Sequence, residues 1–120
     1  MKYMLLVYGA ESAWTQAERE QCMAESAQLC HELAAKGEFL GASPLHPVSS
    51  ATSIRNDGGK KLVVDGPFAE THEQLGGYFL VEVADLDAAL AIAKRIPGGS
   101  RGTVEVRPII DLDTLPKAEC

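Results

Sequence analysis

The chain has 120 residues, of which 46% are hydrophobic and 23% charged, and its formal net charge is −6 at neutral pH. This length and composition are typical of a single globular domain and exclude a chain that is disordered throughout. The acidic charge and the scattered basic residues argue against direct binding to DNA or RNA, which a basic patch usually supports.

The cysteines and the hydropathy pattern bear on the cellular compartment. Cys22 and Cys30 fall in one expected helix, ~12 Å apart along its axis, which is too far for a disulfide. Cys120 would be left unpaired, so we expect a reduced, cytoplasmic protein. We expect neither a signal peptide nor a membrane span, because no charged apolar leader and no apolar run of ~18 residues occur.

The first expected elements are a buried strand over residues 2–8 and a helix over residues 14–36. Thr15 and Glu18 have the spacing of a capping box at the start of the helix, and Gly37 is suited to end it. The apolar stripe predicted for this helix consists of Met23, Ala27, Cys30, Leu33 and Ala34.

The middle of the chain predicts short strands and turns. Residues 38–42 are typical of a second strand, and the prolines within residues 44–47 then favour an extended or turn conformation. Residues 52–55 and 61–65 flank the sequence Asn-Asp-Gly-Gly, which is a strong signal for a β-hairpin. We expect residues 69–74 to form either one helical turn or a loop.

The last part of the chain predicts a second strand–helix–strand unit. Residues 77–83 form the clearest strand, and Asp85 is placed to cap a helix over residues 86–96. Residues 103–108 alternate as a final strand, and residues 111–120 are expected to form an irregular tail. The stripe predicted for the second helix consists of Leu86, Ala89, Leu90 and Ala93.

The order of these elements is β-α-β, a hairpin, and then β-α-β. It predicts one α+β domain over residues 1–120, a ferredoxin-like plait with an antiparallel sheet and both helices on one face. The strand at residues 77–83 is apolar on both faces, with Tyr78 and Leu80 on one and Phe79 and Val81 on the other. We therefore expect a homodimer in which the face without helices packs sheet to sheet.

A resemblance to a known family enters at Asp65, the first residue of the sequence Asp-Gly-Pro-Phe-Ala-Glu-Thr. Together with residues 73–78, 1–9, 82–89 and 104–108, this motif resembles the DGPF branch of the YCII-related proteins, over residues 1 to about 110. The resemblance implies a dimeric α/β barrel of ferredoxin-like subunits with a pocket between the sheet and neighbouring loops. It also implies isomerase-like or lyase-like relatives on the same superfold, and an association of some members with sigma factors.

The wider YCII group is associated with a His–Asp pair whose histidine lies on the first helix, about three turns before the glycine that ends it. This chain has Ala24-Glu25-Ser26 at that place, and His31 is too close to Gly37 to match. The histidine of that pair is therefore not carried over.

The best candidates for acid–base catalysis are Asp65 and His46. A carboxylate beside a histidine fixes the ring tautomer and makes the ring a better base. Two further interpretations stay open, because Asp65 could accept backbone N–H groups within its own turn and His46 could be a solvated loop residue.

The other candidates are Tyr8, Glu70, His72 and Tyr78, which we expect to bind a ligand. Asp65, His46, Glu70 and His72 are metal-ligand types, but no metal-binding spacing supports a site, so we predict no metal and no cofactor. The sequence thus predicts a small-molecule enzyme that acts by acid–base chemistry near the sheet and the dimer interface. The alternative is a non-catalytic binding or regulatory module, linked to sigma-factor-dependent transcription.

Overall fold

The computed structural model describes residues 1–114. The strands are β1 (Lys2–Gly9), β2 (Phe39–Pro44), β3 (Thr52–Asp57), β4 (Lys60–Asp65), β5 (Gln74–Glu82) and β6 (Gly102–Pro108), and the α-helices are α1 (Gln16–Ala35) and α2 (Leu86–Ala93). Short 3-10 helices lie at η1 (Glu11–Ala13), η2 (Val48–Ser50), η3 (Pro97–Arg101) and η4 (Leu112–Thr114).

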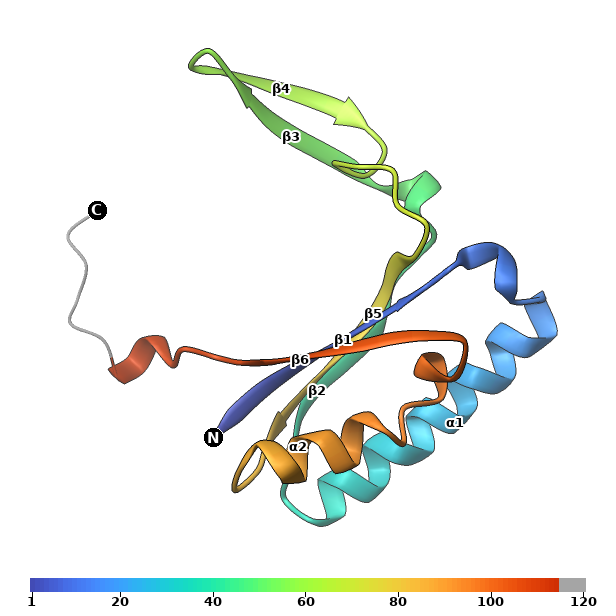
Figure 1. Ribbon diagram of the computed structural model, residues 1–120, viewed down its shortest axis with the longest axis vertical. Coiled ribbons are helices and arrows are strands. Elements are labelled where there is room, and N and C mark those ends of the chain that lie inside the picture. The colour runs from blue at the N-terminus through green and yellow to red at the C-terminus, as the bar shows by residue number, and fades with distance from the viewer. Residues whose placement is uncertain (115–120) are drawn as a thin grey trace.

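The main sheet has four strands in the order β2-β5-β1-β6, and every neighbouring pair is antiparallel. β5 lies between β1 and β2, and β1 lies between β5 and β6, so the chain forms two split β-α-β units. Helices α1 and α2 cover one face of this sheet (Figure 1). The α+β, ferredoxin-like prediction with both helices on one face is confirmed.

The ends of both helices follow local signals in the sequence. At the start of α1 the Thr15 hydroxyl accepts from the Glu18 backbone N–H (3.2 Å), and the Glu18 carboxylate accepts from the Thr15 N–H (2.9 Å). Gly37 follows the helix with φ of 72°, a conformation that glycine adopts without strain. The Asp85 carboxylate accepts from the Ala88 N–H (2.9 Å) and caps α2.

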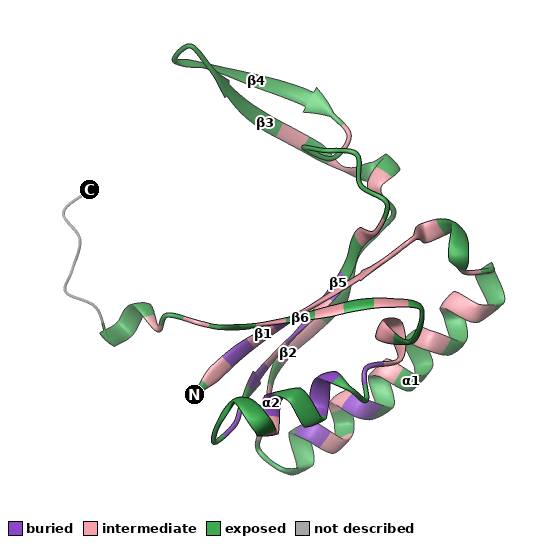
Figure 2. Cartoon of the chain, viewed as in Figure 1, coloured by how far each residue is buried: buried purple, intermediate pink, exposed green. Residues whose placement is uncertain are grey.

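The core lies between the helices and the covered face of the sheet (Figure 2). Leu29 and Leu33 are the buried residues of α1, whereas Met23 is 44% exposed and Ala27 and Ala34 are exposed. The stripe predicted for this helix was therefore wrong except at Leu33 and the half-buried Cys30. The physical reason is that alanine and methionine also suit a solvated helical face. Only the two leucines, Leu29 and Leu33, therefore indicate which side of the helix is buried.

The stripe predicted for α2 also needs correction. Ala89 and Ala93 are buried as expected, but Ile92 is buried with them, whereas Leu86 and Leu90 are exposed. The helix ends at Ala93, three residues earlier than predicted, and Ile96 reaches the core from the turn that follows. In so short a helix, the position of α1 beside it decides which side is covered.

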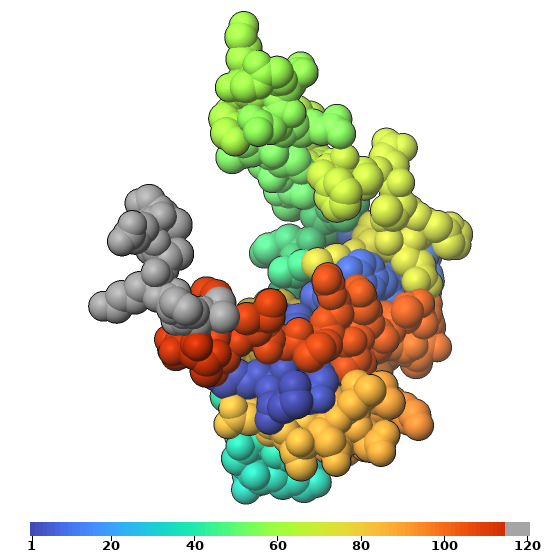
Figure 3. All heavy atoms as spheres, turned by 60° about the vertical axis from the view of Figure 1, so that its left-hand side comes forward, coloured from blue at the N-terminus to red at the C-terminus, as the bar shows by residue number. Residues whose placement is uncertain are grey.

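Strands β3 and β4 form a separate two-stranded sheet, which we call the arm. Gly58 and Gly59 make its two-residue turn with φ of 56° and 88°, as a type I′ hairpin requires. The hairpin prediction is confirmed, but the arm stands away from the main sheet (Figures 1 and 3). It leaves the sheet beyond β2 and returns before β5, on the side without helices.

The remaining segments are irregular where the chain must change direction. Residues 66–73 have no helix or strand, so of the two readings of residues 69–74 the loop is observed up to Glu73 and β5 begins at Gln74. Asp111 accepts from the Lys2 ammonium (3.1 Å), which holds the start of the tail against β1. The rest of the predicted tail, including Cys120, lies outside the described residues.

Candidate functional site

The face of the main sheet that no helix covers, here the helix-free face, has an apolar centre. Alternation along the strands and the register between them place five apolar side chains on it. All five are half-buried in the single chain. They are Met4, Leu6 and Tyr8 of β1 and Tyr78 and Leu80 of β5.

The two edge strands give this face different borders. On β2, Gly41 and Ser43 lie opposite Leu80 and Tyr78. A Cβ atom placed on Gly41 would have no atom within 4 Å, so the surface beside Leu80 is open. The β6 border carries polar side chains at Thr103, Glu105 and Arg107, paired with Tyr8, Leu6 and Met4.

Tyr8 and Tyr78 are the predicted site residues that the structure brings onto one face. The Tyr8 hydroxyl donates to the Glu105 carboxylate (3.4 Å), and the Arg107 guanidinium lies 3.8 Å from the same carboxylate. No hydrogen bond within residues 1–114 engages the Tyr78 hydroxyl. The face therefore combines two aromatic rings with an available hydroxyl, a carboxylate and a guanidinium.

Asp65 ends β4 at the base of the arm, where it pairs with Thr52. The turn beside it is closed by other groups: the Gly66 N–H donates to the Ala51 carbonyl (2.7 Å), and the Ser53 hydroxyl donates to the Gly66 carbonyl (2.7 Å). The Asp65 side chain is exposed and takes part in none of the side-chain hydrogen bonds among residues 1–114. The structure thus does not consume its carboxylate in holding the turn.

His46 lies exposed in the loop between β2 and η2, flanked by Pro44 and Pro47. Within the described chain no hydrogen bond or ion pair joins it to Asp65, so one subunit does not assemble the expected acid–base pair. Leu45 anchors this loop through its N–H to the Gly76 carbonyl (2.8 Å).

Glu70 and His72 are exposed in the loop before β5. The Gln74 amide holds this loop through the Thr71 carbonyl (2.6 Å), and Glu73 accepts from the Thr103 hydroxyl (2.9 Å). The loop is therefore tied to the β6 border of the helix-free face through Glu73, a residue that the sequence analysis did not single out.

Glu11 is a second polar residue that the sequence analysis missed. Its N–H donates to the Gln74 side-chain oxygen (2.9 Å), and its carboxylate accepts from the Val48 N–H (2.9 Å). It thereby links η1, β5 and the base of the arm. No local pattern indicates this role, because its partners lie far away in the sequence.

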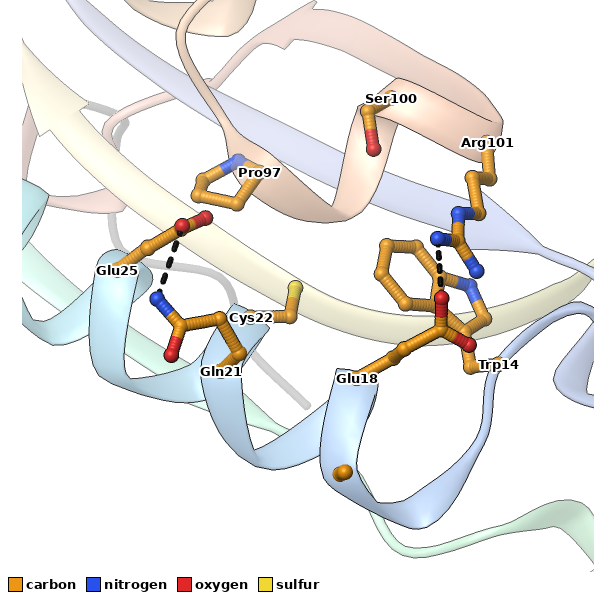
Figure 4. Close-up of a pocket in the computed structure, with 9 residues that line it drawn as sticks. Trp14, Glu18, Gln21, Cys22, Glu25, Pro97, Ser100 and Arg101 are labelled. Carbon is orange, nitrogen blue, oxygen red and sulfur yellow. Dashed lines mark hydrogen bonds and ion pairs between the residues drawn. The ribbon is translucent and has the colours of Figure 1, made fainter.

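A cavity of about 380 Å³ lies on the helix side, between α1 and η3 (Figure 4). The Arg101 guanidinium lies over the Trp14 ring, 4.4 Å from its centroid, and donates to Glu18 and to the Ala13 carbonyl. The hydrogen bond from Arg101 lowers the pKa of Glu18 from 4.5 to about 2. None of the predicted site residues lines this cavity, and its charged groups already have partners: Arg101 pairs with Glu18, and Glu25 accepts from the Gln21 amide.

Cys22 also faces the cavity, and among residues 1–114 neither it nor Cys30 forms a disulfide. Burial raises the pKa of both thiols, which disfavours the reactive thiolate. Their half-buried positions on α1 agree with a role in packing.

Residues 1–114 show neither a metal-binding cluster nor a membrane-spanning helix. Over these residues, no three or more acidic, histidine or cysteine side chains are grouped so that they could hold a metal ion. Neither helix of the described chain has the length and hydropathy needed to cross a membrane.

Comparison with known proteins gives two matches. Residues 1–113 match the family described as the YCII-related domain. The chain is also 37% identical over 114 residues to "Uncharacterized protein R00369" of Rhizobium meliloti (strain 1021), an alignment that covers 91% of this chain and 92% of the relative. The name of this relative states no activity.

Proposed function

Because the chain belongs to the YCII-related family, we propose that it is a homodimeric protein that binds a small organic molecule at the helix-free face. The observation that carries this proposal is the apolar centre of that face, in which Tyr8 and Tyr78 lie beside Leu6. A contiguous apolar surface with polar borders is typical of an interaction site. The proposal includes membership of the DGPF branch, which the motif at residues 65–68 supports.

Pairing of two helix-free faces would leave a space for a ligand rather than a filled interface. Gly41 contributes no side chain, and the surface above it is open. A ligand there would meet the Tyr78 hydroxyl, whereas the Glu105 carboxylate and the Arg107 guanidinium lie at the far border. Ligand pockets commonly combine an apolar lining with a few such polar groups.

Within this proposal the chemistry is acid–base catalysis. The exposed Asp65 carboxylate accepts no hydrogen bond from its own turn, and His46 lies in the loop that leads to the arm. Glu70 and His72 belong to the loop that is tied to the β6 border, where they would contact a ligand from the side. A catalytic carboxylate needs a second titratable group within hydrogen-bond reach, which the ligand-bound dimer must supply.

One observation favours the alternative, a non-catalytic binding or regulatory module, including one that serves sigma-factor-dependent transcription. Among residues 1–114, Asp65 and His46 are both exposed, and no hydrogen bond or ion pair joins them. A ligand that binds to the protein but is not converted into a product would support this alternative.

The test is a thermal-shift screen against small organic acids, lactones and phenolics, with wild type, Tyr78→Phe and Asp65→Asn. Asp57→Asn is the matched control, because Asp57 is the other acidic residue of the arm and lies at its tip. We expect at least one ligand to raise the midpoint of thermal unfolding of wild type and of the control. The same ligand should not raise the midpoint of Tyr78→Phe. Such a ligand is then assayed for turnover by wild type and Asp65→Asn.

A ligand that still raises the thermal midpoint of Tyr78→Phe would show that it binds away from the helix-free face. Loss of turnover with retained binding in Asp65→Asn would support the catalytic role of Asp65. Equal turnover by the two proteins would remove that role.

A further inference from the structure

The arm is the part of the molecule whose exposure the single chain does not explain. Its two strands have six residues each, and nearly all of these residues are exposed. A two-stranded hairpin without a packing surface is marginal in water. The arm also exposes branched apolar side chains to solvent. A hairpin that stays solvated usually carries polar or charged side chains at such positions.

The two most exposed apolar side chains of the arm form one cross-strand pair, whereas Leu62 and Val64 lie on the other face. Ile54 lies directly opposite Val63, and the two side chains are 69% and 71% exposed. Alternation places Thr52 and Asp65, which also pair with each other, on the same face as Ile54 and Val63. We call this the Ile54 face of the arm.

The position of the arm favours a second copy of the chain as its partner. The arm rises on the helix-free side of the main sheet (Figures 1 and 3). A six-residue strand spans ~20 Å, about twice the ~10 Å that separates packed sheets. If two helix-free faces pair about a two-fold axis, each arm must extend beyond its own sheet and lie against the other copy.

The charge of the arm agrees with this partner. Residues 55–61 at the tip carry three basic side chains, Arg55, Lys60 and Lys61, and one acidic side chain, Asp57. The tip therefore has a formal charge of +2 within a chain of −6, which leaves −8 on the remaining residues. A basic tip is attracted to another copy whose remaining residues carry a net negative charge.

We propose that the arm of each subunit packs its Ile54 face against the helix-free face of a second copy of this chain and brings Asp65 to the site of that copy. This inference rests on the proposed homodimer and adds that its sites are shared between subunits. The polar groups at each site are then Tyr78 and Glu105 of one subunit and Asp65 of the other. It explains why the Asp65 carboxylate finds no side-chain partner among residues 1–114 of its own subunit.

The test measures the dimer dissociation constant by analytical ultracentrifugation for wild type and for Ile54→Thr/Val63→Thr. Threonine keeps the β-branched shape and the strand preference of both positions, so the hairpin itself is retained. We expect dimerisation at least tenfold weaker, because each dimer would lose apolar contacts at four positions. The control is Met23→Gln/Leu86→Gln, which removes half-exposed apolar side chains from the helix layer and should change the constant less than twofold.

A third variant, Leu6→Lys, separates this inference from the proposal on which it rests. A wild type that is monomeric at all concentrations, or a Leu6→Lys variant that still dimerises, would refute pairing through the helix-free face. A Leu6→Lys variant that is monomeric beside an arm variant with unchanged affinity would refute the role of the arm alone.

A photo-crosslinking amino acid in place of Val63 locates the arm directly. We expect a covalent dimer whose cross-linked peptides come from β1 or β5 of the other copy. Cross-links confined to one chain would show that the arm closes over its own sheet and would overturn the inference.

Discussion

Replacement of Leu33 by alanine tests which side of α1 is buried. Leu33 is 1% exposed and packs in the core with the other buried residues of both helices. The substitution removes about three methylene equivalents, worth ~2.4 kcal/mol of transfer free energy at ~0.8 kcal/mol each. A cavity of about 220 Å³ already borders Leu33 and Ile92, so the neighbours can relax and the added cavity cost is small.

We therefore expect Leu33→Ala to lower the free energy of unfolding by about 3 kcal/mol. The matched control is Met23→Ala, which shortens a side chain that is 44% exposed on the same helix and should cost less than ~1 kcal/mol. Urea unfolding followed by circular dichroism, at one protein concentration, would show a midpoint lower by about 1–3 M for Leu33→Ala alone. Equal costs for the two variants would refute the observed orientation of α1.

Two further predictions concern Glu18 at the start of α1 and Gly102 at the start of β6. The Arg101 hydrogen bond lowers the pKa of Glu18 to about 2, so its stabilising effect is complete above pH ~4.5 and disappears as the pH falls toward 2. The melting temperature of wild type should thus exceed that of Glu18→Gln, which keeps the capping box, at pH 7 and converge with it near pH 2. A constant difference would contradict this assignment. A Cβ on Gly102 would lie 2.0 Å from the Tyr8 carbonyl oxygen, so Gly102→Ala should lower the melting temperature by several degrees, whereas Gly41→Ala should change it little. Similar melting temperatures of these two variants would show that β6 can shift.

The candidate site was only partly predictable. Tyr8 and Tyr78 were candidates from the sequence, but that they share one face follows from the register between β1 and β5. The sequence motif drew attention to Asp65, but its distance from the main sheet follows from the outward path of the arm. The Trp14–Arg101 pair was not predicted, because its members are far apart in the sequence and no pattern links them.

The sequence by itself determined the order of the elements, the helix caps at Thr15 and Asp85, and the hairpin turn at Gly58-Gly59. These features depend on hydrogen bonds and φ angles within a few neighbouring residues, so local chemistry suffices to specify them. Only the tertiary structure decided which sides of α1 and α2 are buried and that the arm stands apart from the main sheet. Those outcomes depend on which surfaces meet, and apolar burial is non-directional, so the sequence pattern of one element cannot specify its partner.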